Sequence, residues 1–303
     1  MTYALSIVAL ASIFSLLTLA LNLHFGLTGL INFGIVAYFA IGAYVYAIAT
    51  AEPPSALDQY AVGLGWPGWA GVLAAIVAAV VFAAVTGWPA LRLRAEYLAL
   101  TTFAFAEVLH SVLTNSSEIG NGTRGMSNVV PPFYNSLPFD TYDTWFAVIT
   151  VAVLLVSTIA LLRIARSPFG ATLRAIRDDE LAAAAVGKPI QRYRLESFLA
   201  GAAIAGVAGV LYAWFTTLVS PDLYTADITF TAFIALVIGG VGSNFGAIVG
   251  AFVLFGLEQA IRIVPLSEQT AQLASSMRLV PFGLALILML RFRPQGLAGR
   301  WAV

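Results

Sequence analysis

The sequence predicts an all-α, polytopic integral membrane protein with about nine (eight to ten) transmembrane helices, some of them short or broken. Of the 303 residues, 60% are hydrophobic and only 10% are charged. The mean hydropathy is +0.90, and an ordinary soluble domain carries about 25% charged residues. So few charges cannot solvate a globule of this size, which excludes a soluble two-domain enzyme and a disordered chain. We expect one transmembrane domain over residues 1–303.

Charge balance and the absence of cysteine exclude further classes. Fifteen basic residues balance fifteen acidic ones, so no overall field indicates a nucleic-acid partner. With no cysteine in the sequence, disulfides, thiolate metal sites and cysteine nucleophiles are excluded. We expect neither a metal nor a cofactor.

Apolar stretches of about membrane length follow one another along the chain. A bilayer core about 30 Å thick needs roughly 20 helical residues per crossing. The first stretch is interpreted as a retained span, because it lacks the basic segment and cleavage site of a signal peptide. The nine predicted stretches are 4–23, 30–50, 67–89, 97–114, 145–163, 196–219, 228–240, 246–262 and 279–291.

The distribution of basic residues predicts the orientation. With nine crossings, twelve of the fifteen basic residues fall on one side, and seven of them lie in 163–195. This places the C-terminus in the cytoplasm and the N-terminus outside. The segment 115–144, rich in turn-forming residues, is then an external loop, and 163–195 is a cytoplasmic loop.

The cytoplasmic segment is predicted to form two short helices. Ser167 and Pro168 provide an N-cap and a proline in the first turn. Three acidic residues from Asp178 onward suit the start of a second helix, which Gly187 and a following proline would end. By composition the segment is either a basic loop against lipid headgroups or a docking helix in a groove of a soluble partner.

Five segments in order resemble the LivM-type permease subunits of branched-chain amino-acid ABC importers. They are GLTGLINFGIVAYFAIGAY at 26–44, PALRLRAEYLALTTFAFAEV at 89–108, SPFGATLRAIRDDELAAAAVG at 167–187, VIGGVGSNFGAIVGAF at 237–252 and FRPQGLAG at 292–299. The resemblance covers nearly the whole chain. It implies a translocation path for branched-chain (hydrophobic) amino acids in the bacterial plasma (inner) membrane. Because urea, sugar and nucleoside permeases are relatives, urea or another small solute is the alternative.

The resemblance also implies partners. Besides the lipid bilayer, these are a second, LivH-type permease, two cytoplasmic ABC ATPase subunits and an extracytoplasmic solute-binding protein. In such permeases a cytoplasmic loop docks on the ATPase, and 163–195 matches it, with departures at Ala184 and at Lys188-Pro189 that bear on partner specificity. The predicted ATPase-coupling residues are Arg174, Arg177, Asp178, Asp179, Glu180, Ala182, Ala183 and Gly187.

No nucleotide-binding motif occurs in the chain. The nearest run ends Gly-Lys-Pro at 187–189, and it lacks both the first glycine and the hydroxyl of a phosphate-binding loop. We therefore expect a transport subunit rather than an enzyme, with ATP hydrolysed by partner chains.

Ionisable residues inside the spans allow several interpretations. Glu107 and His110 lie one turn apart in the fourth span, near the membrane midplane. They are either functional or held in interhelical hydrogen bonds. As a proton relay they would indicate an ion-coupled secondary transporter that works without partners. A third alternative is a membrane scaffold or an intramembrane enzyme, but no catalytic group beyond these two residues is evident for it. Glu258 and Arg262 are expected to form a structural ion pair.

Two glycine-rich breaks, 22–32 and 239–246, interrupt apolar runs, and an Asn-Phe-Gly sequence accompanies each. Non-helical backbone at membrane depth is tolerated only inside protein or beside water, and broken helices of transporters bind small zwitterions. The alternative is that these glycines allow close packing or form cytoplasmic turns. His24 is interpreted as an interfacial residue. The predicted substrate-path residues are Asn22, Thr28, Asn32, Glu107, His110 and Asn244.

Overall fold

The computed structural model describes residues 3–54, 60–127, 129–132, 139–263, 291 and 296–297. Apart from one pair of two-residue strands, the regular elements are helical, which confirms the all-α class. The helices are α1 (Tyr3–Leu21), α2 (Ile35–Thr50), α3 (Gly68–Ala90), α4 (Ala95–Asn115), α5 (Phe139–Arg166), α6 (Pro168–Asp178), α7 (Glu180–Ala185), α8 (Ile190–Thr216), α9 (Ala226–Gly239) and α10 (Asn244–Ile263). The short elements are the π-helical turn η1 (Asn22–Leu27), the 3-10 turns η2 (Gly122–Arg124) and η3 (Pro221–Leu223), and the strands β1 (Met126–Ser127) and β2 (Leu218–Val219).

The transmembrane prediction is confirmed for the part of the chain that the structure describes. Six segments there are long and apolar enough to cross a bilayer, and two shorter apolar helices, Ile35–Thr50 and Asn244–Leu257, accompany them. These eight helices correspond to the first eight predicted stretches. The ninth stretch, 279–291, lies outside the described residues except for its last position, and so do the side chains of the predicted Glu258–Arg262 pair. The total of nine stays a prediction.

The second span begins later than predicted. The sequence predicted a helix from residue 30, but α2 starts only at Ile35. Gly29 has a φ of +75°, a conformation that glycine adopts without strain. The side-chain oxygen of Asn32 accepts the backbone N–H of Gly34 at 2.8 Å, a local turn that competes with helix. Residues 28–34 therefore form a non-helical connection.

Both predicted loops contain regular structure. α5 begins at Phe139, inside the predicted external loop, and β1 in that loop pairs antiparallel with β2. The two short helices predicted in 163–195 are confirmed as α6 and α7. Ser167 caps α6 by accepting the N–H of Gly170, and Asp179 caps α7 by accepting the N–H of Ala182 at 3.0 Å.

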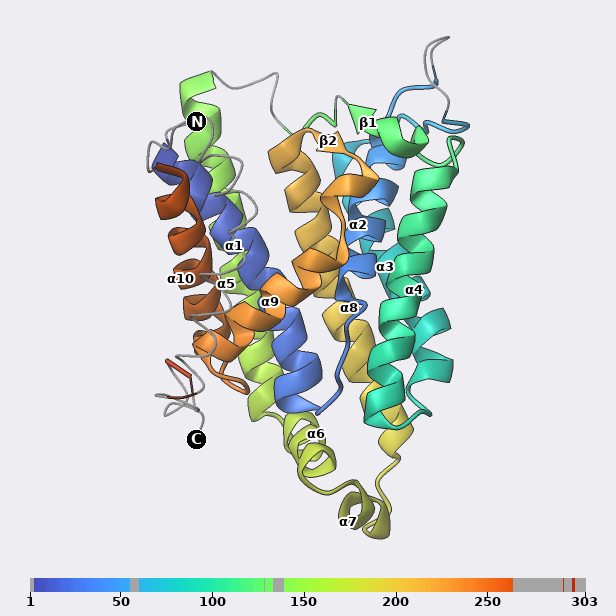
Figure 1. The fold of residues 1–303 in the computed structure, drawn as a ribbon, viewed down its shortest axis with the longest axis vertical. Helices are drawn as coiled ribbons and strands as arrows, with labels where there is room; N and C mark the ends of the chain where they lie inside the picture. The colour runs from blue at the N-terminus through green and yellow to red at the C-terminus, as the bar shows by residue number, and fades with distance from the viewer. Residues whose placement is uncertain are drawn as a thin grey trace.

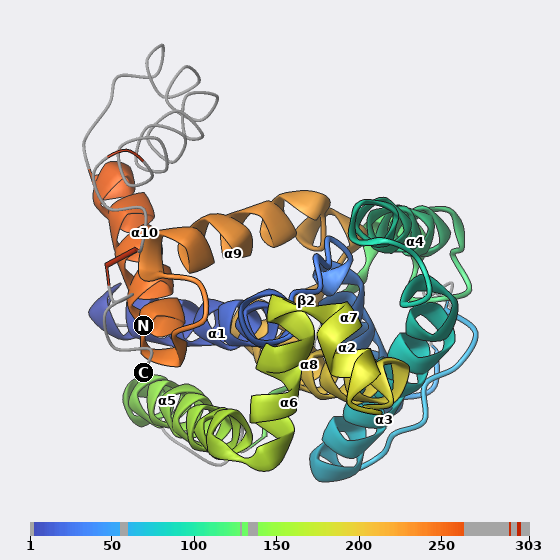
Figure 2. The same ribbon diagram turned by 90° about the horizontal axis from the view of Figure 1, so that it is seen from below.

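Helices α1, α2 and α8 form the centre, with the others arranged around them (Figure 2). In a representative apolar stretch of 18 residues from each span, 67% of the residues are buried for α1 and 61% for α8, against 28% for both α4 and α5. Glycines allow α2 and α8 to approach at backbone contact, because a Cβ on Gly42 would overlap the carbonyl oxygen of Gly206. Such close packing of small residues is typical of helices inside membranes.

The helices run alternately up and down, and α6 and α7 lie together beyond one end of the bundle (Figure 1). α1 begins near the opposite end, where β1 and β2 also lie. Near the chain's end, the N–H of Leu297 donates to the carbonyl of Ile238 at 3.0 Å, which places Leu297 beside the α9–α10 turn.

Ser127 in β1 and Ala182 in α7 are both exposed and lie at opposite ends of the bundle (Figure 1). The charge distribution predicts that Ala182 lies in the cytoplasm. Because the chain has no cysteine, one introduced cysteine is a unique reporter. In cells stripped of any outer membrane, Ser127→Cys should react with an impermeant thiol reagent, and Ala182→Cys should react only after permeabilisation. The reverse pattern would invert the orientation.

Candidate functional site

The two glycine-rich breaks meet in the structure. The side-chain Nδ2 of Asn22, the first residue of η1, donates to Oδ1 of Asn244 at 2.8 Å. Its Oδ1 accepts the backbone N–H of Gly242 at 2.8 Å. Gly26 lies so close that a Cβ there would overlap Asn22 Oδ1. One buried asparagine therefore ties the end of α1 to the α9–α10 turn, and we call these four residues the asparagine junction.

A second polar cluster joins the break to α8. His24 is fully buried and stacks on Phe198, with ring centroids 5.1 Å apart. The Asn32 amide donates to His24 Nδ1 at 3.2 Å, so the ring proton lies on Nε2, which donates to the carbonyl of Phe198 at 3.1 Å. The interpretation of His24 as an interfacial residue is therefore wrong, because the ring lies in the protein interior.

Hydroxyl groups complete this cluster. Thr28 Oγ1 donates to the carbonyl of Leu23 at 2.9 Å and lies 2.6 Å from Ser197 Oγ. Gly201 leaves room for the imidazole, since a Cβ there would overlap the His24 ring. The sequence analysis missed Ser197 and Gly201, because one serine and one glycine in an apolar helix form no pattern. Together the two clusters satisfy the buried polar groups of the break.

The structure separates the six predicted substrate-path residues into two sets. Asn22, Thr28, Asn32 and Asn244 are buried and bonded to other protein groups. Glu107 and His110 lie on α4, and in the described part of the chain no hydrogen bond joins them to the other four residues. Glu107 is exposed on the surface of this helix, whereas His110 Nε2 is buried without a hydrogen-bond partner in the described part of the chain.

The two arginines of α6 donate to backbone carbonyls of neighbouring elements. Arg177 Nη1 donates to the carbonyl of Gly26 in η1 at 2.5 Å, and Arg177 also pairs with Asp178 at 2.8 Å. Arg174 Nη1 donates to the carbonyl of Ala165 near the end of α5 at 2.6 Å. The first of these bonds attaches α6 directly to the asparagine junction.

The α7 helix is fixed from both ends. Glu180 forms a two-point ion pair with Arg194 of α8, at 2.9 and 2.7 Å. At the other end Gly187 has a φ of +76°, and the N–H of Lys188 returns to the carbonyl of Ala183, the usual glycine ending of a helix.

The free face of α7 is apolar. Ala183 is buried, but Leu181 is 82% exposed and Val186 is 74% exposed, although both lie outside the transmembrane helices. Exposed apolar side chains of this size make this part of α7 a candidate partner surface. The sequence analysis named the charged and small residues of α7 and missed these two. We call Leu181, Ala182 and Val186 the α7 surface.

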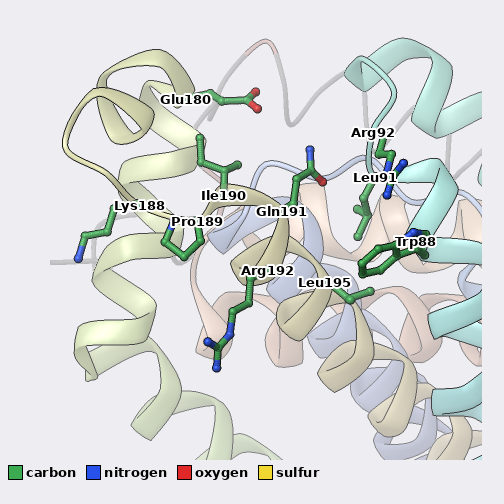
Figure 3. Close-up of a pocket in the computed structure, with 10 residues that line it drawn as sticks. All are labelled: Trp88, Leu91, Arg92, Glu180, Lys188, Pro189, Ile190, Gln191, Arg192 and Leu195. Carbon is green, nitrogen blue, oxygen red and sulfur yellow. The ribbon is translucent and has the colours of Figure 1, made fainter.

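A cavity of about 620 Å³ lies beside α7, between the end of α3 and the start of α8. Figure 3 shows Trp88, Leu91 and Arg92 facing Gln191 and Leu195, while Lys188 and Arg192 point away from the tryptophan. The Arg92 guanidinium lies 5.2 Å from the Trp88 ring centroid, a cation–π distance. Apolar and charged side chains line this cavity, and the three residues of the α7 surface are not among them.

Comparison with known proteins decides the family. The family described as "Branched-chain amino acid transport system / permease component" matches residues 3–290. The chain belongs to this family. The resemblance inferred from the five segments is thereby confirmed, and the protein is a transport permease subunit rather than an enzyme.

Individual relatives of this family are similar over most of their length. The chain is 32% identical to the high-affinity branched-chain amino acid transport system permease protein LivM of Escherichia coli K12, over 96% of this chain and 69% of that protein. It is 30% identical to LivH of the same organism, over 97% and 93%. A probable LivM of Methanocaldococcus jannaschii is 27% identical, over 94% and 90%. No solved structure matches the chain.

Proposed function

We propose that this permease is one of two different permease subunits of an ABC importer in the bacterial plasma (inner) membrane. A solute-binding protein delivers branched-chain (hydrophobic) amino acids, and two separate cytoplasmic ATPases drive their passage. The family and the printed names of the relatives support this assignment. Those relatives are branched-chain amino-acid permeases, so urea and ion-coupled transport are not favoured.

The observation that carries the proposal is the bond from Arg177 to the carbonyl of Gly26. A transporter driven by a separate ATPase needs a mechanical connection from its docking segment to the membrane helices that enclose the solute. α6 provides it, because its guanidinium holds η1 at the point where Asn22 also binds the α9–α10 turn. A movement of α6 would then displace both broken segments together.

The α7 surface supplies the docking contact in this proposal. Burial of a leucine or valine side chain contributes about 1.5–3 kcal/mol each, so Leu181 and Val186 would anchor α7 in a groove of an ATPase subunit. The pair of Glu180 with Arg194 would keep α7 aligned with α8. The cavity beside Trp88 would receive a neighbouring apolar segment of the same subunit.

The proposal separates docking from coupling, and two variants test the two roles. Arg177→Met keeps the length of the side chain but removes a charged hydrogen bond worth about 1.5–3 kcal/mol. We expect the ATPases to stay bound while binding-protein-dependent leucine uptake falls about ten- to a hundredfold. Uptake into reconstituted vesicles and ATPase co-purification measure this. Arg163→Met, at an exposed position of α5, is the matched control and should leave both unchanged.

Gly187→Trp should instead detach the ATPases. A Cβ on Gly187 meets nothing within 4 Å, so the indole would project outward, and the positive φ would strain the helix end. Normal membrane insertion with lost co-purification is the expected result. If Gly187→Trp kept the ATPases bound, or if Arg177→Met released them, the two assigned roles would be wrong.

The proposed substrate gives a separate prediction. Leucine uptake by the reconstituted complex should require the solute-binding protein, and excess isoleucine or valine should compete with it while urea should not. The purified permease alone should bind these amino acids weakly, because the buried polar side chains of the two breaks already have protein partners. Urea as the only transported solute would refute the substrate and leave the fold unaffected.

A further inference from the structure

Two outer helices show what a lipid-facing surface looks like in this protein. α3 exposes Leu73, Val77, Val81 and Val85 at four-residue spacing, between Trp69 near one end and Trp88 near the other. α5 exposes Val148, Leu155, Val156 and Ile159 along its middle. An aliphatic stripe flanked by tryptophans is typical of a helix against lipid tails and headgroups.

The outward stripe of α4 is different. It runs through Leu100, Ala104, Glu107 and Ser111, which are all exposed. Glu107 lies twelve residues from the first residue of α4 and eight from the last, near the middle of a membrane-length helix. In the described part of the chain no cation or hydrogen-bond donor contacts its carboxyl. A carboxyl at this depth is too costly to face lipid.

The non-helical connection lies on the same side. Residues 28–34 pass between α4 and α9 (Figures 1 and 2), where the backbone N–H of Phe33 donates to Thr102 Oγ1 at 3.1 Å. Thr102 is seven residues into α4, about 10 Å along its axis, so this backbone lies at membrane depth. Gly29, Ile31 and Phe33 are only half-buried. Such backbone is stable only beneath protein or beside water.

Aromatic rings of α4 and α9 lie beside this connection. Phe33 contacts Phe230 and Phe233 of α9, with centroids 5.7 and 4.9 Å apart, and Phe103 of α4 lies 6.4 Å from Phe230. Phe103 is one helical turn from Glu107, on the same side of α4. The α4–α9 face therefore combines a carboxyl with apolar walls, which suits a solute with an ammonium group and a hydrophobic side chain.

We propose that the α4–α9 face, defined by Leu100, Glu107, Ser111, Phe33 and Phe230, is the surface on which the second permease subunit seats, with the solute passage at the seam. This inference rests on the proposed function. The occupant must itself span the membrane, because the face lies at membrane depth. A second permease of the same fold fits, since LivM and LivH of one organism both match this chain over nearly its full length.

Site-specific photo-crosslinking in the assembled, lipid-embedded complex tests the seam. A photoreactive amino acid at Leu100, which is 66% exposed on the same stripe of α4 as Glu107, should form an adduct with the second permease. The matched positions Val81 on α3 and Val156 on α5, 55% and 68% exposed, should give no such adduct. Mass spectrometry identifies the partner. Adducts at Val81 or Val156 without one at Leu100 would overturn the assigned face.

Water access tests the passage. A hydrophilic thiol reagent should modify Ser111→Cys in the complex at least about tenfold faster than Val81→Cys, because only a hydrated thiol ionises and reacts. Equal, slow modification of both would overturn the passage at this seam. A purified complex with only one kind of permease chain would instead contradict the proposed function, and this outcome is separate from a seam on another face.

Discussion

The structure depends on one constraint, which is that backbone leaving the helical conformation inside a bilayer must find its hydrogen bonds within the protein. In the described part of the chain, two connections between membrane helices leave the helical conformation and contact each other, one after α1 and the other at the α9–α10 turn. Asn22 meets the need of both breaks, because it accepts from Gly242 and donates to Asn244. Two further bonds join the first break to α8. His24 bonds to the carbonyl of Phe198, and Thr28 bonds to Ser197. Each break therefore supports the other.

This mutual support makes a mechanical unit. An unpaired buried polar group costs about 1–3 kcal/mol, so η1 and the α9–α10 turn are better moved together than apart. Arg177 of α6 donates to the carbonyl of Gly26 in that unit. The next helix in the chain is α7, which carries the α7 surface. The non-helical connection 28–34, which follows η1, passes between α4 and α9. Glu107 is exposed on α4. In the proposed importer, docking, transmission and passage would follow one continuous series of contacts.

The sequence could predict the helices, the class and the family, because apolar length and local signals such as Ser167, Asp179 and Gly187 act within a few residues. It also placed Asn22 and Asn244 in breaks. It could not pair them, since 222 positions separate them and no local pattern records their contact. The direction of Arg177 and the burial of His24 were missed for the same reason. Both are set by packing between helices that are distant in the sequence.

The central claim is that α6 and the α9–α10 turn move as one body, and a spin–spin distance measures this directly. Ala175 on α6 and Val241 in the turn are both exposed, and the chain has no other cysteine to label. In the complete importer, the distance between labels at these positions should be the same without nucleotide and in the ATP-trapped state. Arg177→Met should broaden it. A distance that changes on ATP trapping with Arg177 intact would contradict the account.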